Sequence, residues 1–93
     1  INLSPYETKL MTNSTLWTVN ATCTIQNQNH LKSRVRITVM KNSGNINGKT
    51  LLKGQGTLVT VQDNSNVSVS AESGTQINLL NLSPDTIQAN CSS

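Results

Sequence analysis

The sequence predicts an all-β protein, an antiparallel β-sandwich of about seven short strands in an immunoglobulin-like arrangement. Apolar and polar residues alternate with a period of two from residue 16 onward, which is typical of strands that bury one face. Clusters of Gly, Asn, Asp and Ser separate the alternating runs at spacings of roughly ten residues. No segment has the periodicity of a long helix. We therefore expect residues 1–93 to form a single sandwich domain.

The first two strands are expected at residues 16–25 and 31–40, where the alternation is most regular. Their Thr, Asn, Lys and Arg residues should face solvent, and the residues between them should face the core. The inward set is Trp17, Val19, Ala21, Cys23 and Ile25 in the first strand, and Leu31, Ser33, Val35, Ile37 and Val39 in the second.

Five more strands are expected at residues 50–53, 57–62, 67–71, 76–82 and 87–91. The resemblance to immunoglobulin domains is architectural only, because the antibody order of cysteine, tryptophan and cysteine is absent.

Two structures fit the N-terminal segment equally well. Ser4 as a cap, Pro5 at the first position and Glu7 three residues after the cap would begin a short helix. A short edge strand over Glu7–Met11 is the alternative.

Asn is abundant, and several Asn residues begin Asn-x-Ser/Thr triplets. We interpret these triplets as features of a polar-faced β-protein rather than as glycosylation sites. The letters NLSP occur at 2–5 and again at 81–84, and both copies are interpreted as turns that end strands. The triplets begin at Asn2, Asn13, Asn20, Asn66, Asn81 and Asn90.

Cys23 and Cys91 are predicted to form a buried disulfide, because both fall at inward positions of their strands. The alternative is two buried free thiols. A thin core of small aliphatic residues needs such a supplement, and closing this loop would stabilise the fold by roughly 4 kcal/mol. A disulfide indicates a periplasmic or extracellular protein. A chain that begins at Ile1 without a basic and apolar leader suits an exported product whose signal peptide has been removed. No apolar run is long enough to span a membrane.

Gly48-Lys49-Thr50 resembles the end of a nucleotide-binding P-loop, but the spacing is wrong. Only three residues separate Gly44 from Gly48, and no helix can follow before the next glycines. Asn47-Gly48 is instead a strong signal for a tight hairpin turn, which is the structure we expect.

Little in the sequence supports catalysis. His30 is the only histidine and is expected in a solvent-exposed loop, and no ligand set for zinc or calcium is evident. We therefore predict a protein that is not an enzyme and has no metal or cofactor. The four carboxylates belong to Glu7, Asp63, Glu72 and Asp85.

A row of basic residues is the one hint of a ligand. Lys32, Arg34 and Arg36 alternate along one strand and should share its outward face, as a possible anion-binding site. Such a row suits an anionic glycan, lipopolysaccharide or an anionic membrane surface, whereas nucleic acid is disfavoured because no aromatic residues interleave with the charges. Charged rows are ordinary on solvent-facing sheets, so the favoured explanation is a solvated strand face, or one that Asp63, Glu72 or Asp85 neutralises across strands.

Two functions are consistent with these features. The first is a small exported binding or recognition module that contacts an anionic surface ligand or another protein. The second is a structural or assembly subunit of a surface or envelope complex, which would offer a strand edge to a neighbour. The oligomeric state is left open.

Overall fold

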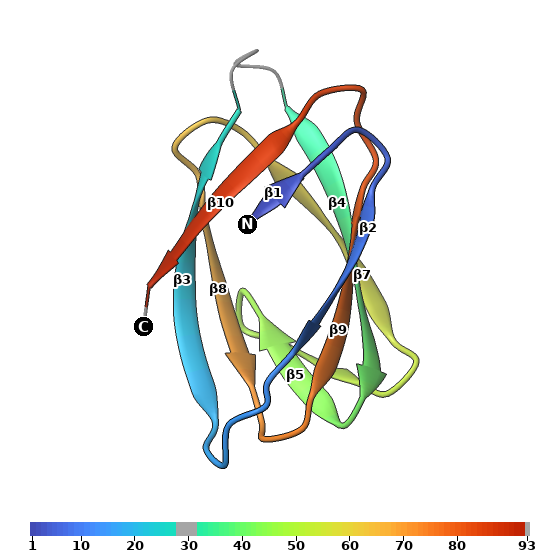
Figure 1. Ribbon diagram of the computed structural model, residues 1–93, viewed down its shortest axis with the longest axis vertical. Coiled ribbons are helices and arrows are strands. Elements are labelled where there is room, and N and C mark those ends of the chain that lie inside the picture. The colour runs from blue at the N-terminus through green and yellow to red at the C-terminus, as the bar shows by residue number, and fades with distance from the viewer. Residues whose placement is uncertain (28–31, 93) are drawn as a thin grey trace.

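The computed structural model describes residues 1–27 and 32–92. In these residues it has ten β-strands in two facing sheets (Figure 1). The molecule measures 37 × 24 × 20 Å, and most of its loops lie toward the two ends of the long axis, whereas the turn of the β5–β6 hairpin lies near the middle. The strands are β1 (Asn2–Leu3), β2 (Thr8–Thr12), β3 (Val19–Gln26), β4 (Ser33–Lys41), β5 (Ser43–Ile46), β6 (Lys49–Leu52), β7 (Gly56–Val61), β8 (Asn66–Ala71), β9 (Gln76–Asn81) and β10 (Ile87–Ser92).

Strands that are far apart in the sequence lie side by side. Sheet A has the order β1-β10-β3-β8-β5-β6, and sheet B has the order β2-β9-β4-β7. The chain is therefore an antiparallel ribbon, folded back at β5–β6 and wound so that successive strand pairs fall in opposite sheets. This is the strand order of a jelly roll. The predicted antiparallel sandwich is confirmed, but its strand order differs from the immunoglobulin-like one that we expected, because local alternation does not encode long-range pairing.

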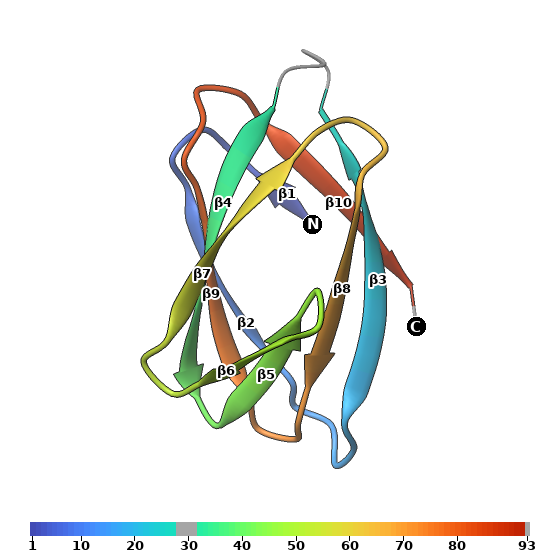
Figure 2. The ribbon, with the colours of Figure 1, turned by 180° about the vertical axis from the view of Figure 1, so that it is seen from behind.

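The extra strands are short segments without clear alternation. Residues 43–46 were not among the expected strands, but they form β5, which pairs with β6 and β8. Between β5 and β6, Asn47 and Gly48 have φ of 51° and 86°, and Ile46 pairs with Lys49 (Figure 2). This two-residue turn confirms the hairpin and leaves no phosphate loop. At the N-terminus, β2 confirms the edge strand rather than the helix.

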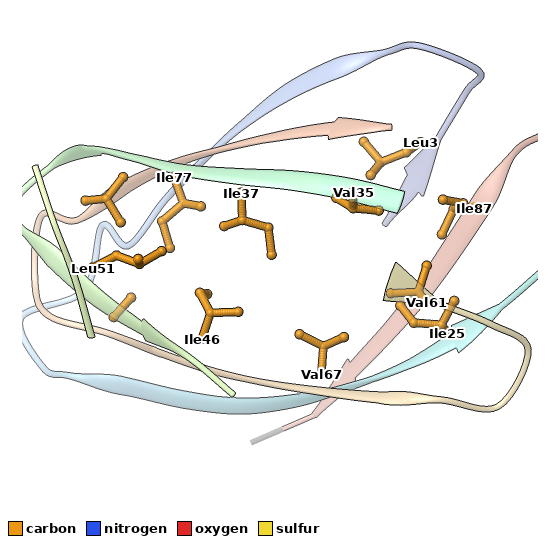
Figure 3. Packing of buried hydrophobic residues seen from close by; sticks show 12 residues of the cluster. Leu3, Ile25, Val35, Ile37, Ile46, Leu51, Val61, Val67, Ile77 and Ile87 are labelled. Atoms are coloured by element: carbon orange, nitrogen blue, oxygen red, sulfur yellow. The ribbon is translucent and has the colours of Figure 1, made fainter. Parts of the chain in front are cut away.

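The core lies between the sheets and is built from small aliphatic side chains (Figure 3). The expected inward alternation is confirmed for β4, where residues 33, 35, 37 and 39 are all buried. Two of the predicted positions, His30 and Leu31, lie outside the described residues. The buried apolar residues are Leu3, Ile25, Val35, Ile37, Val39, Ile46, Leu51, Val61, Val67, Ala71, Ile77 and Ile87.

Trp17 was expected in the core, and this prediction is wrong. Its side chain is 73% exposed, because residues 13–18 form a loop and the first long strand begins only at Val19. The alternation of apolar and polar residues extends from β3 back into this loop, so the pattern alone does not show that the strand starts at Val19.

Candidate functional site: surfaces for assembly

Strand β2 forms one open edge of sheet B. On either side of β2, the carbonyl of Glu7 accepts from the N–H of Asn81 in β9, and the N–H of Asn13 donates to the carbonyl of Thr75, just before β9. Alternate residues of an antiparallel strand direct their backbone groups to the same side. The N–H and C=O groups of Thr8, Leu10 and Thr12 therefore point away from the sheet, where a further strand can pair with them.

Strand β7 forms the opposite edge of sheet B. The backbone N–H of Val39 donates to the carbonyl of Gln55 at 2.9 Å, which fixes the residues of β7 that face β4. By the same alternation, the backbone groups of Gly56, Leu58 and Thr60 point outward.

These two edges have few of the features that protect exposed strands from pairing. Edges are commonly protected by charged residues, proline, bulges or short length. Strand β7 contains no charged residue or proline, and the one charge of β2, the Lys9 ammonium, donates to the carbonyl of Asn2 at 2.9 Å. The edges of sheet A are shorter: β1 has two residues, and β6 has four, beginning with Lys49 and followed by Lys53.

The space between the sheets is open on one side. Strand β1 covers only the start of β10, so the rest of β10 has no neighbouring strand on that side among the described residues. An apolar cavity of about 350 Å³ lies there, lined among others by Met11, Val19, Leu79 and Cys91. Part of the small core is therefore accessible from the flank of the sandwich.

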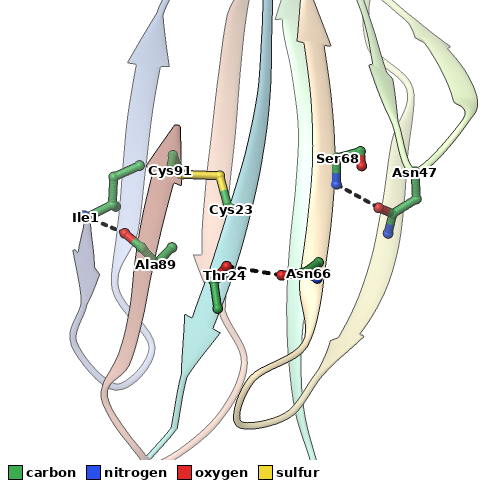
Figure 4. The surroundings of a disulfide bond; sticks show 8 residues. All are labelled: Ile1, Cys23, Thr24, Asn47, Asn66, Ser68, Ala89 and Cys91. Atoms are coloured by element: carbon green, nitrogen blue, oxygen red, sulfur yellow. Dashed lines mark hydrogen bonds between the residues drawn. A yellow bond between two sulfur atoms is a disulfide. The ribbon is translucent and has the colours of Figure 1, made fainter. Parts of the chain in front are cut away.

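Cys23 and Cys91 form a disulfide between directly paired residues of β3 and β10 (Figure 4). Both line the cavity, so their inward direction is as expected. Their expected burial is wrong: Cys23 is half-buried and Cys91 is exposed, because sheet B does not cover this part of sheet A.

The predicted basic row lies on the outer face of sheet B. Lys32 precedes β4, and Arg34 and Arg36 lie on β4 with exposed side chains. Directly opposite Arg36 are Leu80 and Leu58, and opposite Arg34 on β7 is a threonine. Within these strands no carboxylate is paired with either arginine, so cross-strand neutralisation does not occur there. Anion binding stays a prediction.

One end of the sandwich, here named the Tyr6 end, comprises loops 4–7, 62–65 and 82–86. The side chain of Asn81, which is fully buried, joins two of these loops. Its Nδ2 donates to the carbonyls of Leu3 (3.2 Å), Ser4 (3.2 Å) and Asp85 (2.7 Å). Its Oδ1 accepts from the backbone N–H and the hydroxyl of Ser83, at 2.9 and 2.8 Å. The two NLSP segments are confirmed as strand-ending turns, and Asn81 contacts both.

The opposite end, the Trp17 end, comprises loops 13–18, 53–55 and 72–75. The side chain of Asn13 joins loops at this end by hydrogen bonds, as the side chain of Asn81 does at the Tyr6 end. Its Nδ2 donates to the carbonyls of Trp17 (2.9 Å), Ala71 (2.9 Å) and Glu72 (3.1 Å). Its Oδ1 accepts from the backbone N–H and hydroxyl of Thr15, at 3.1 and 2.6 Å.

Sequence analysis missed the role of these two asparagines, although a signal was present. Asn13-Ser-Thr15 and Asn81-Leu-Ser83 are two of the Asn-x-Ser/Thr triplets. Asn followed two residues later by Ser or Thr is suited to a local turn in which the Asn oxygen accepts from that residue. The triplet by itself does not reveal which asparagines also join a second loop.

The described residues contain no group of three or more His, Cys, Asp or Glu side chains that could hold a metal ion. They also include no helix long and apolar enough to cross a membrane.

A disulfide-linked jelly roll with open sheet edges and loops fixed by hydrogen bonds has the features of a structural or assembly protein. The comparison with protein families agrees. The family Enas, described as endospore appendages, matches residues 3–82, and the chain belongs to this family. No curated protein and no solved structure matches the chain.

Membership of this family bears on three predictions: whether the protein is an enzyme, where it is located, and whether it is a binding module or a structural subunit. The family is structural and non-catalytic, which confirms that the protein is not an enzyme. An endospore appendage lies outside the spore, so the extracellular location is supported and the periplasmic one is not. The disulfide suits such an oxidising exterior. The structural alternative is favoured over the binding module.

Proposed function

We propose that this protein is a self-associating subunit of an endospore appendage, and that its copies assemble by pairing the open edges of sheet B. The observation that carries the proposal is the presence of two unprotected edges on one sheet of a protein from an appendage family. Each edge offers three consecutive sets of outward backbone groups, which is the requirement for β-augmentation.

The directions of the two edge strands suit such pairing. Strand β2 runs toward the Trp17 end, and β7 runs away from it (Figures 1 and 2). When two copies stand side by side in the same orientation, β7 of one copy is therefore antiparallel to β2 of the next. The contact is heterologous, since each copy uses two different surfaces, and such contacts continue into rings or open fibres. Self-association is thus the expected state of the protein.

Proline at an outward position of an edge strand tests this pairing. In Leu10→Pro the lost N–H points to solvent, so the bonds between β2 and β9 remain. We expect the purified variant to stay monomeric in light scattering and electron microscopy, at concentrations where the unaltered protein forms assemblies. Leu10→Thr is the matched control, because it removes the same side chain but keeps the N–H, and it should assemble normally.

Circular dichroism and thermal unfolding establish that Leu10→Pro is folded. Normal assembly of a folded Leu10→Pro variant would refute pairing through β2. An unaltered protein that stays monomeric at all accessible concentrations would refute the subunit role itself.

A further inference from the structure

Two large apolar side chains are presented to solvent at the Trp17 end. Leu16 is 83% exposed and Trp17 is 73% exposed, and neither contributes to the core. The chain has one tryptophan and one tyrosine, and both are exposed on end loops. Trp is enriched at the energetic centres of protein interfaces, where its area and its N–H are both used.

The loop that carries these side chains is held in one conformation. Besides the bonds of Asn13, the hydroxyl of Thr15 donates to the carbonyl of Trp17 at 3.0 Å, and the hydroxyl of Ser73 donates to the carbonyl of Thr15. Asn42 in turn donates to the carbonyl of Ser73 at 2.8 Å, which joins this loop system to the end of β4. A loop ordered in advance loses little conformational entropy when it binds.

The Tyr6 end presents a second set of apolar side chains. Tyr6 is 63% exposed, and Pro5 and Pro84 are also exposed. They belong to the two loops that Asn81 joins, so they are close together. Tyr6 has φ of 58°, in the left-handed region that non-glycine residues rarely adopt. Such residues cluster at functional sites, where the surrounding structure holds them in place.

The charges of the two ends are complementary. Beside the Trp17 loop, the exposed residues Lys41 and Lys53 outnumber the single carboxylate, Glu72. The loops of the Tyr6 end carry three carboxylates, those of Glu7, Asp63 and Asp85, and no lysine or arginine. Lys32 and Arg34 lie just beyond these loops, before and in β4. Opposite potentials steer two surfaces together and favour one orientation.

We propose that copies of this protein also stack end to end, with Leu16 and Trp17 of one copy packed on Pro5, Tyr6 and Pro84 of the next. This inference rests on the proposed self-association and adds a second direction to it. The two ends lie at opposite ends of the long axis (Figure 1). Since edge pairing keeps neighbouring copies in the same orientation, all Trp17 ends point the same way, and every layer can receive another.

The only tryptophan of the chain reports directly on this contact. Emission and acrylamide quenching of Trp17 are measured together with light scattering while the protein concentration is raised. We expect the emission to shift to shorter wavelength, and quenching to fall severalfold, as assemblies form. Emission and quenching that stay at the monomer values in fully assembled protein would refute the end contact and would leave the edge pairing intact.

Variants identify both partners of the contact. Trp17→Ser and Tyr6→Ser should each raise the concentration at which long fibres form by more than about tenfold, since truncating such interface aromatics has effects of this size. Short lateral assemblies made through the β2 and β7 edges should persist. Thr22→Ala, at an exposed position of the central strand β3, is the control and should assemble normally. Fibres of normal length from folded Trp17→Ser would overturn the proposal.

Mixing the two variants tests the direction of the contact. Trp17→Ser keeps an intact Tyr6 end and has no tryptophan, and Tyr6→Ser keeps an intact Trp17 end. Adding Trp17→Ser to Tyr6→Ser should therefore shift the tryptophan emission, as in the unaltered protein. An unshifted mixture would refute the proposed pairing. A normal shift in Tyr6→Ser alone would refute it too, because it would show that Trp17 contacts a different surface.

Discussion

The two ends of the sandwich use the same device for different purposes. Asn13 and Asn81 each donate to three backbone carbonyls and accept from the Ser or Thr two residues later. Asn81 is fully buried at the end of the central strand β9, whereas Asn13 is half-buried just beyond the edge strand β2. Identical local chemistry thus closes the core at one end and holds an exposed apolar loop at the other.

The difference shows that position in the sheets decides the role of a turn motif. At the Tyr6 end the motif belongs to the second NLSP segment, bonds to the first, and satisfies polar groups that are buried or partly buried. At the Trp17 end the same bonds are largely exposed, and water can replace them. The first arrangement is expected to matter for stability, and the second for presenting Leu16 and Trp17 in a fixed position.

The largest expected effect on the free energy of unfolding comes from the disulfide, which links strands that start at the two different ends. The disulfide joins β3, which leaves the Trp17 end, to β10, which leaves the Tyr6 end. Reduction, or Cys23→Ser with Cys91→Ser, should lower the free energy of unfolding by roughly 4 kcal/mol, because a long loop in the unfolded chain is released. Denaturant unfolding with and without reductant measures this.

Intact mass and thiol labelling verify the bond itself. In unfolded, unreduced protein neither cysteine should react with a thiol label. Labelling of both cysteines, or an unchanged unfolding free energy after reduction, would contradict the prediction.

The next effect compares the two asparagines directly. Asn81→Ala leaves several buried polar groups without partners and should cost about 3 kcal/mol or more. Asn13→Ala exposes its partners to water and should cost about 1 kcal/mol. Equal losses of unfolding free energy in the two variants would show that the ends do not differ as their burial indicates. Asn20→Ala, at an exposed position of β3, serves as the control and should have little effect.

The smallest effect on stability concerns the basic row, which lies on the sheet between the two ends. Replacing Lys32, Arg34 and Arg36 by Ser should change the unfolding free energy little, because all three are exposed. If the row binds polyanions, the triple variant should lose retention on heparin, on lipopolysaccharide and on anionic vesicles. Retention of the unaltered protein should fall steeply with salt, as the Debye length shortens from about 10 Å at 0.1 M.

Equal retention of the two proteins on all three surfaces would leave the row as a solvated face. Retention on these anionic surfaces should also be unchanged in Trp17→Ser and Tyr6→Ser, because neither end loop belongs to the basic row.

The sequence by itself determined the local features of this protein. Period-two alternation located seven of the strands, and it assigned the inward face of β4 because side chains of a strand point to alternate sides. The pair Asn47-Gly48 determined its hairpin turn, since both residues tolerate positive φ. The outward direction of Arg34 and Arg36 followed from the same alternation.

Only the tertiary structure decided which strands pair and which surfaces stay open. The jelly-roll order depends on contacts such as Cys23 with Cys91, between residues far apart in the chain, and no local pattern specifies them. The exposure of Cys91 follows from the part of sheet A that sheet B leaves uncovered, and that of Trp17 from a loop that continues the alternating pattern. Asn13 and Asn81 occur in the same sequence motif, yet their burial differs because one follows an edge strand and the other ends a central one. The surfaces proposed for assembly arise from these long-range positions.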